Sequence, residues 1–315
     1  MGHDLGYAAL ALLATSAYYA AFLFFRASAL RMPPLRGSRP FHVAGLMLTS
    51  PVWFAGGLIL FAGLAGEVVA FTAMPLAAAQ PVFAVSLVLL VTYAVWGLGE
   101  RFGAREWASI ALFVLATVLI GLSAGDDQAL RADASLLHTL RAPWPMLAVL
   151  APAVVVAGLI WLVGDRRAGG RHARRLAGVA YGIGAGACAG LAEAGVRGIA
   201  IRYDQTGGIT DVLRSPYPYL TLGIAAIALG QLQVALQRCR IAVVAAVLTV
   251  IGRTYLLVSS MVLFGEHWPR EAREHWLRTA GFTLTFVAVV LFPRYERTNG
   301  HPEAAERRAP RGTNA

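Results

Sequence analysis

The chain has 315 residues, of which 57% are hydrophobic and only 14% are charged, and its mean hydropathy is +0.61. A soluble domain of this size needs more charge to cover its surface, so the composition excludes an ordinary globular protein and indicates a membrane protein. The net charge of +10 does not indicate nucleic-acid binding, because the basic residues lie in short segments between apolar runs.

Nine apolar segments are long enough to cross a bilayer. They lie near residues 5–25, 51–72, 76–97, 107–124, 144–164, 176–201, 219–237, 241–264 and 276–293. The first is not a signal peptide, because its positive charges follow the apolar run instead of preceding it. The sequence therefore predicts an all-α, polytopic membrane protein with about nine transmembrane helices. Cys188 and Cys239 lie within or beside predicted helices, and no disulfide is expected.

Most arginines lie in alternate segments between the predicted spans, at 26–39, 101–105, 166–175, 238–240 and after 293. By the positive-inside rule these segments face the cytoplasm. We therefore expect a multi-pass protein of the cytoplasmic membrane with its N-terminus outside and its C-terminus inside. The outward segments 126–141 and 202–218 are polar and are expected to lie flat on the surface. The tail, 294–315, is expected to be disordered.

An internal repeat joins the two halves of the chain at an offset of 166 residues. It aligns LVTYAVWGLGE with LLVSSMVLFGE, Trp53 with Tyr219 and Glu67 with Gln233. Spans one to four then correspond to spans six to nine, and the two copies run in opposite directions. The predicted architecture is an inverted-repeat (4+5) bundle, which is typical of alternating-access carriers. Its parts are residues 1–125, the connecting segment 126–175 with unpaired span five, and residues 176–293.

The residues that end and begin helices in this repeat resemble those of the drug/metabolite transporter (EamA-like) superfamily. An apolar helix ends in Gly99-Glu100-Arg101 and Trp107 opens the next, and the second copy has Gly265-Glu266 and Trp276. Within that superfamily the chain is similar to the NIPA-type, magnesium-transporter-like branch. The matching positions are Trp53, Gly66-Glu67, Phe71, Pro75-Leu76, Pro81 and Gly99-Glu100-Arg101.

The resemblance implies a transporter, with Mg²⁺ as one candidate cargo. One departure bears on the cargo: the branch tends to carry Asn just before the phenylalanine, where this chain has Ala70. Alanine offers no oxygen ligand, which weakens the magnesium inference. The second copy also has Val247 where the first has Pro81.

The segment 178–201 carries a stripe of glycines that leads to two charges. The stripe recurs every four residues and consists of Gly178, Gly182, Gly186 and Gly190. This spacing places the glycines on one helical face, where a neighbouring helix or a substrate can approach closely. Glu193 and Arg197 continue the same face and are close enough in sequence to bridge on their own helix.

Four ionisable residues lie within predicted spans, namely Glu67, Glu193, Arg197 and Arg253. A charge at the bilayer centre costs about 2.5–3.5 kcal/mol on insertion scales, so each needs a partner or a watery cavity. They either line a substrate or ion pathway or form a structural ion-pair network. Gln80, Gln231 and Gln233 would add hydrogen bonds to a substrate or between helices.

No catalytic constellation accompanies these residues. The segment 121–125 fits a nucleophile-elbow pattern, but it ends a predicted membrane helix and lacks the required strand. No phosphate-binding Gly-Lys-Ser/Thr loop and no His spacing typical of a metal site is present. The sequence therefore predicts neither an enzyme nor a bound cofactor.

Three functions stay open at this point. The first is a secondary transporter that moves a small solute by alternating access, coupled to ions or exchange through Glu193 or Glu67. The second is a Mg²⁺ transporter or channel with Glu67 and Glu193 as carboxylate ligands. The third is a membrane scaffold or subunit that docks a partner on the glycine stripe. The expected partners are a small-molecule or ion substrate and the lipid bilayer, with a homodimer left open.

Overall fold

The computed structural model describes residues 2–35, 39–73, 103–123, 143–163, 171–264 and 271–291, with Val85, Val88, Thr92 and Trp268 besides. The predicted segments 126–141 and 294–315 lie outside these residues, and 76–97 lies almost wholly outside them. The helices are α1 (Gly2–Arg31), α2 (Pro40–Leu48), α3 (Pro51–Ala73), α5 (Ala104–Leu122), α7 (Pro143–Val163), α8 (Arg171–Thr206), α9 (Ile209–Arg214), α10 (Tyr217–Arg238), α11 (Ile241–Phe264) and α12 (Ala272–Leu291). The described residues contain no strand, which confirms the predicted all-α class.

Several of these helices are long and apolar enough to cross a membrane. Four qualify alone: Ala9–Arg31, Ala177–Tyr203, Tyr217–Arg238 and Val243–Leu263. The bent pair α2–α3 gives a fifth, and Trp107–Leu122 and Leu147–Leu162 are shorter apolar helices. Every predicted span except 76–97 coincides with a helix. The chain is thus a multi-pass membrane protein, whereas the count of nine crossings stays a prediction.

A sharp bend separates α2 from α3, where Thr49 and Ser50 are the only polar residues between two apolar helices. The two helices meet at 88°. Pro51 opens α3 and has no amide hydrogen to continue the α2 ladder. The Ser50 hydroxyl accepts a hydrogen bond from the Trp53 amide at 3.3 Å, as an N-cap does, and bonds to Ser28 of α1 at 2.8 Å.

The outward segment 202–218 was predicted as a surface loop, and the structure corrects this. Helix α8 continues to Thr206 and ends at Gly207, whose positive φ of 63° suits glycine. The Gly207 amide donates to the Tyr203 carbonyl at 2.7 Å, and the short helix α9 follows. Polar side chains do not by themselves predict a loop, because helix formation depends on backbone hydrogen bonding as well as on hydropathy.

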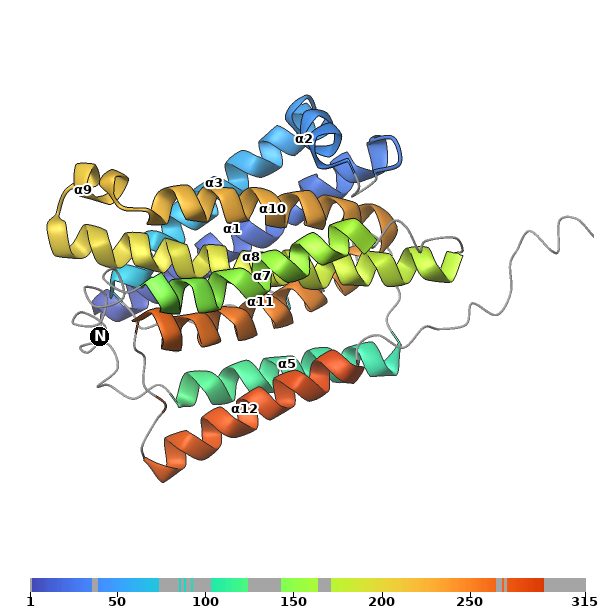
Figure 1. Cartoon of the computed structure of the whole chain (residues 1–315). Helices are drawn as coiled ribbons and strands as arrows, with labels where there is room; N and C mark the ends of the chain where they lie inside the picture. The colour runs from blue at the N-terminus through green and yellow to red at the C-terminus, as the bar shows by residue number, and fades with distance from the viewer. Residues whose placement is uncertain are drawn as a thin grey trace, which may run out of the picture.

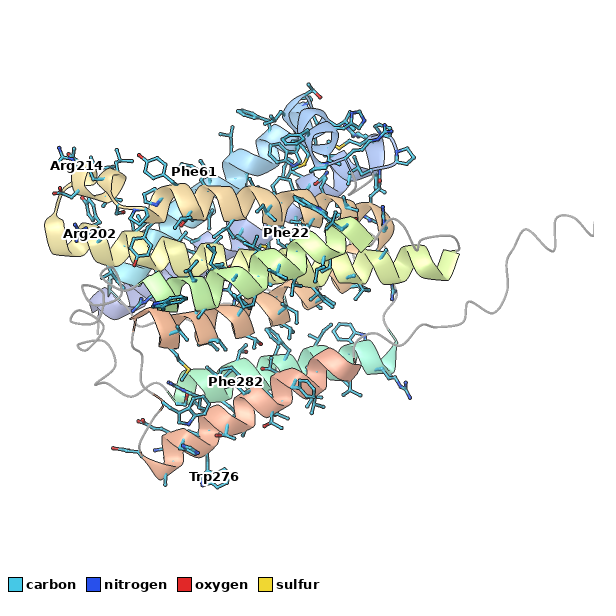
Figure 2. All side chains as sticks on the ribbon, viewed as in Figure 1. Phe22, Phe61, Arg202, Arg214, Trp276 and Phe282 are labelled. Carbon is cyan, nitrogen blue, oxygen red and sulfur yellow. The ribbon has the colours of Figure 1, made fainter. Side chains whose placement is uncertain are left out.

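Helix α8 is the centre of the bundle and packs against α10, α11, α7 and α3 (Figure 1). Helix α1 packs along α3, and α10 connects these two groups through α1. Helices α5 and α12 form a separate pair beside α11, with Trp276 pointing away from the other helices (Figure 2). The Ser109 hydroxyl donates to the Ala288 carbonyl at 2.6 Å and joins the two helices of this pair.

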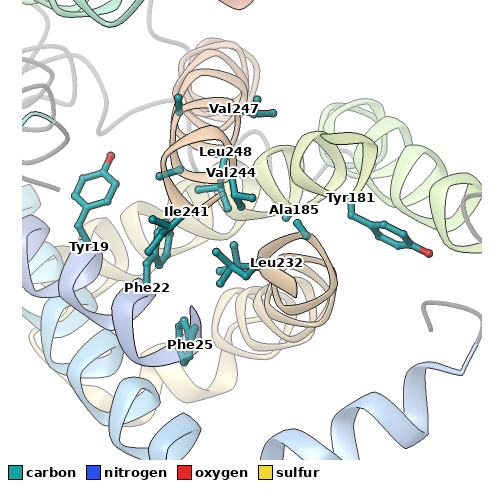
Figure 3. Packing of buried hydrophobic residues seen from close by; sticks show 14 of the residues in the cluster. Tyr19, Phe22, Phe25, Tyr181, Ala185, Leu232, Ile241, Val244, Val247 and Leu248 are labelled. Atoms are coloured by element: carbon teal, nitrogen blue, oxygen red, sulfur yellow. The ribbon is translucent and has the colours of Figure 1, made fainter. Parts of the chain in front are cut away.

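The largest apolar cluster lies where α1, α8, α10 and α11 meet. Figure 3 shows its residues, with Phe22 of α1, Leu232 of α10 and Ile241 of α11 brought together. Phe22 and Ile241 are fully buried. This cluster fixes α11 against α1 and α8, and thereby sets the positions of the polar side chains one to three turns further along α11.

The ends of α1 and α10 are tied together by one side chain. The Gln237 amide nitrogen lies 3.1, 3.2 and 3.0 Å from the carbonyls of Ala29, Met32 and Pro33, and its oxygen accepts from the Leu35 amide at 2.6 Å. The same end of the bundle carries several arginines. They are Arg26, Arg31, Arg238 and Arg240, and the first donates to the Cys239 carbonyl at 2.6 Å.

Replacing Gln237 by alanine is expected to lower the free energy of unfolding by about 1–3 kcal/mol, because four backbone groups lose their partner. The measurement is the thermal unfolding midpoint of the purified protein in detergent. Thr283→Ala is the matched control, since the exposed Thr283 hydroxyl bonds only within its own helix and its loss should cost less than about 0.5 kcal/mol. Equal effects of both substitutions would contradict this account of the tie.

Candidate functional site

A buried ion pair between Glu193 of α8 and Arg253 of α11 forms the centre of the candidate site. A guanidinium nitrogen of Arg253 donates to the Glu193 carboxylate. The side chains are 7% and 5% exposed, so neither charge reaches solvent. Arg253 lies near the middle of α11, too far from either end to extend its head group to the membrane surface. Within the bundle, each of these two charges is compensated by the other.

The glycine stripe of α8 lies against α11 and brings the two charges into reach. A Cβ at Gly190 would overlap the Gly252 carbonyl oxygen and lie 2.9 Å from its carbon. A Cβ at Gly186 would lie 2.9 Å from the Leu248 carbonyl oxygen. Backbone therefore meets backbone one turn from Glu193 and Arg253, an approach that only small residues permit.

Of the two remaining glycines of the stripe, one faces the end of α10 and the other faces α11. Gly178 faces Cys239 and Arg238, and Gly182 faces Val247 with more room, since a Cβ there would lie 3.5 Å from the valine methyl. Thus α11 covers three of the four glycines, and the end of α10 with the residue after it covers Gly178. In the described structure these four glycines already contact other parts of the chain, which gives no support to a partner that docks on the stripe.

Glu67 of α3 lies beside this pair without a hydrogen-bond partner. It is 1% exposed, and neither carboxylate oxygen bonds to any part of the chain that the structure describes. It interacts electrostatically with both Glu193 and Arg253. Gly63 and Gly66 hold this part of α3 close to Ala14 of α1. The carboxylate is therefore available to take up a proton or a cation.

Hydroxyl groups from α1 and α11 complete the site, and the sequence argument did not single them out. The hydroxyls of Tyr19 and Thr249 bond to each other at 2.9 Å across the α1–α11 contact. Together with Tyr18, Glu193 and Arg253 they line a cavity of about 10 Å³. A cavity of this size is at the lower limit for one water molecule. The adjacent tyrosines in the first predicted span were the available signal.

The other predicted site residues are placed differently. Arg197 is buried one turn beyond Glu193 on α8, whereas Glu193 pairs across to α11. Gln233 donates to the Phe25 carbonyl at 3.1 Å, toward the end of α1 that carries the arginines. Gln231 donates to the Ala157 carbonyl of α7 at 2.9 Å. Both glutamines act between helices in this conformation, and Gln80 lies outside the described residues.

The chemistry of the site is that of oxygen donors around one guanidinium. The cavity is lined by the Glu193 carboxylate and the tyrosine–threonine hydroxyl pair, and the buried Glu67 carboxylate interacts electrostatically with Glu193. Among the residues that the structure describes, no group of three or more His, Cys, Asp and Glu side chains could hold a metal ion. Hard cations such as Mg²⁺ prefer oxygen ligands and keep several waters when they bind.

A family model described as "Magnesium transporter NIPA" matches residues 8–297 of the chain. The chain belongs to this family. The match runs from α1 through α12. It confirms the resemblance to the NIPA-type branch that was based on the repeated Gly-Glu pairs at helix ends. No curated protein and no solved structure matches the chain. As a member of the NIPA family, the chain is a multi-pass membrane protein of a transporter family, and the residues of the candidate site lie within the matched part.

Proposed function

We propose that the chain is a secondary transporter that moves its cargo across the cytoplasmic membrane by alternating access, with Glu67, Glu193 and Arg253 at the binding site. The observation that carries this proposal is the buried Glu193–Arg253 pair beside the unpartnered Glu67 carboxylate. Ionisable groups inside a membrane bundle are costly and mark substrate or ion pathways. Belonging to the NIPA family supports the same conclusion.

The contacts between helices support an inverted-repeat architecture. Helix α1 packs on α3 as α8 packs on α10, and α1 contacts α10 as α3 contacts α8. Helices α5 and α12, which the repeat makes equivalent, pack on each other. This pattern is expected when α1, α3 and α5 are related to α8, α10 and α12 by a two-fold axis in the membrane. The Glu67 site then lies at the interface between the two repeats.

The cargo favoured by the family is Mg²⁺, and two features of the site suit a cation. Glu67 and Glu193 supply two carboxylates, and the neighbouring hydroxyls supply further oxygens. The cavity has room for about one water molecule, so the helices would have to separate for a cation with its waters and to separate further for an organic solute. Ala70 is fully buried and adds no ligand. An organic solute coupled to an ion through Glu67 is the second candidate, and it shares the same carboxylates.

The arginines support a cytoplasmic placement of the end of the bundle where Gln237 ties α1 to α10. Arg26, Arg31, Arg238 and Arg240 gather there, and α8 begins at Arg171 on the same side, where Gly178 faces Cys239. With this end inside, α1 begins outside the cell and the C-terminus follows α12 into the cytoplasm.

Glu67→Gln tests the proposal cleanly, because it removes a charge and breaks no hydrogen bond in the described structure. In proteoliposomes we expect Mg²⁺ uptake to fall at least about 10-fold, equivalent to about 1.4 kcal/mol in the barrier. Stability should change by less than about 1 kcal/mol. Glu193→Gln and Arg253→Ala should also lose transport, whereas Glu271→Gln, at an exposed site, is the control.

The outcomes of that experiment separate the candidates. Uptake of Mg²⁺ by the unmodified protein that disappears in Glu67→Gln supports the divalent cation as cargo. If Mg²⁺ does not enter but a panel of organic solutes reveals one that does, the second candidate is supported. Near-normal transport by Glu67→Gln, Glu193→Gln and Arg253→Ala together would remove these residues from the site.

A further inference from the structure

We propose that Arg253 is a built-in substitute for the cargo cation, whose pairing with Glu193 lets the unloaded carrier return across the membrane. The inference rests on the proposed function with a divalent cation as cargo. It assigns the described conformation to the unloaded carrier and makes the Glu193–Arg253 pair part of the transport cycle. Arg253 is then a positioning residue that sets which steps of the cycle are permitted.

The Arg253 guanidinium occupies the place on Glu193 that a cargo cation would take. Arg253 holds the carboxylate that, with Glu67, would bind a cation, and it does so from the opposite helix. A cation that bound to Glu193 would have to displace the guanidinium, because like charges repel at such a distance. The hydroxyl oxygens of Tyr19 and Thr249 line the cavity beside Arg253 and can accept hydrogen bonds from the displaced group.

Moving an empty, charged site across the membrane has a free-energy cost. A carrier must move its site from one side of the membrane to the other, and an ionised carboxylate without a counter-ion is strongly disfavoured in a closed, low-dielectric bundle. A carrier without an internal cation would therefore return only with cargo bound and would exchange cargo for cargo. With Arg253 on Glu193, the empty site keeps only the Glu67 carboxylate without a counter-ion, and a proton taken up there leaves the site neutral. The geometry thus points to a carrier capable of net transport.

Arg253 cannot be explained as a surface charge. It is 4% exposed, and the turns of α11 around it pack on α8, with Leu256 fully buried. Its nearest stripe contact, Gly190 against Gly252, is one residue away and holds α11 at backbone distance from α8. This close packing keeps the guanidinium within reach of Glu193.

The test compares two fluxes in the same proteoliposomes, using Mg²⁺ alone as the probe. Net uptake is measured into vesicles without internal Mg²⁺, and exchange is measured as entry of ²⁵Mg²⁺ into vesicles loaded with natural-abundance Mg²⁺. For the unmodified protein we expect net uptake within about 10-fold of exchange. For Arg253→Gln we expect net uptake to fall at least about 10-fold more than exchange. Arg253→Lys keeps the positive charge and should restore net uptake at least in part.

Each outcome decides the inference. An unmodified protein that exchanges Mg²⁺ without net uptake overturns it, and this result needs no variant. A parallel fall of both fluxes in Arg253→Gln, or net uptake that Arg253→Lys does not recover while its exchange persists, overturns it as well. If the unmodified protein carries Mg²⁺ in neither assay, the proposed cation transport itself fails. Retained exchange by Arg253→Gln shows at the same time that the variant is folded.

Discussion

Gly190→Ala is expected to destabilise the protein by at least about 3 kcal/mol, at the upper end of the usual cost of overpacking. The added methyl group would overlap the Gly252 carbonyl oxygen and lie 3.1 Å from its Cα atom. These are backbone atoms, which cannot turn aside as the end of a side chain can. Helix α11 would have to move away from α8, and Arg253 would move with it. The substitution should therefore weaken both the fold and the ion pair.

Gly182→Ala is the matched control on the same stripe. There the new methyl group would lie 3.5 Å from Val247, an ordinary packing distance. Because alanine is also the better helix former by about 0.8–1.0 kcal/mol, this variant should be neutral or slightly more stable. Thermal unfolding in detergent, followed by the reactivity of the fully buried Cys188 thiol, reports both changes. Equal unfolding midpoints for the two variants would contradict the close approach at Gly190.

Glu193→Gln is expected to cost about 3–5 kcal/mol of stability, because it leaves the Arg253 guanidinium buried without its carboxylate. The double variant Glu193→Gln/Arg253→Gln removes both charges, and replacing both members of a buried pair is far less costly than breaking it. We therefore expect the double variant to be at least about 2 kcal/mol more stable than Glu193→Gln alone.

A double-mutant cycle measures this coupling directly. The free energies of unfolding of the unmodified protein, the two single variants and the double variant give the interaction energy of the pair. A double variant whose loss equals the sum of the single losses would show that Glu193 and Arg253 act independently. Such additivity would also remove the physical basis for compensation of the empty site.

Much of the helical framework could be predicted from the sequence, since long apolar segments carry a strong signal. The start of a span near Pro51 was predicted, whereas helix α2 and the bend after it were not, because hydropathy does not report the direction of a helix. The extension of α8 to Thr206 was missed because its last turn is polar. Hydropathy identifies the segments that cross the membrane, but it does not show where a helix bends or ends.

For the candidate site, the spacing of glycines predicted a close contact but could not specify the helix that makes it. Periodicity describes one helix at a time, and the partner of a face depends on the arrangement of the whole bundle. For the same reason the sequence suggested Arg197 as an intrahelical partner of Glu193, whereas in the structure Glu193 pairs with Arg253, 60 residues away. Tyr19 and Thr249 carry no charge and gave no comparable signal.

Helix α8 is bare on two faces, and this has a mechanical consequence. Besides the stripe against α11, its Gly195 lies against Thr221 and its Gly198 against the ring of Tyr217, both on α10. A contact made by long side chains can adjust by rotamer changes, but a glycine backbone has nothing to rotate. A shift of α11 is therefore expected to displace the axis of α8, whereas the side chains of Thr221 and Tyr217 leave α10 some freedom to adjust. The central helix is thus coupled rigidly to α11 and less rigidly to α10.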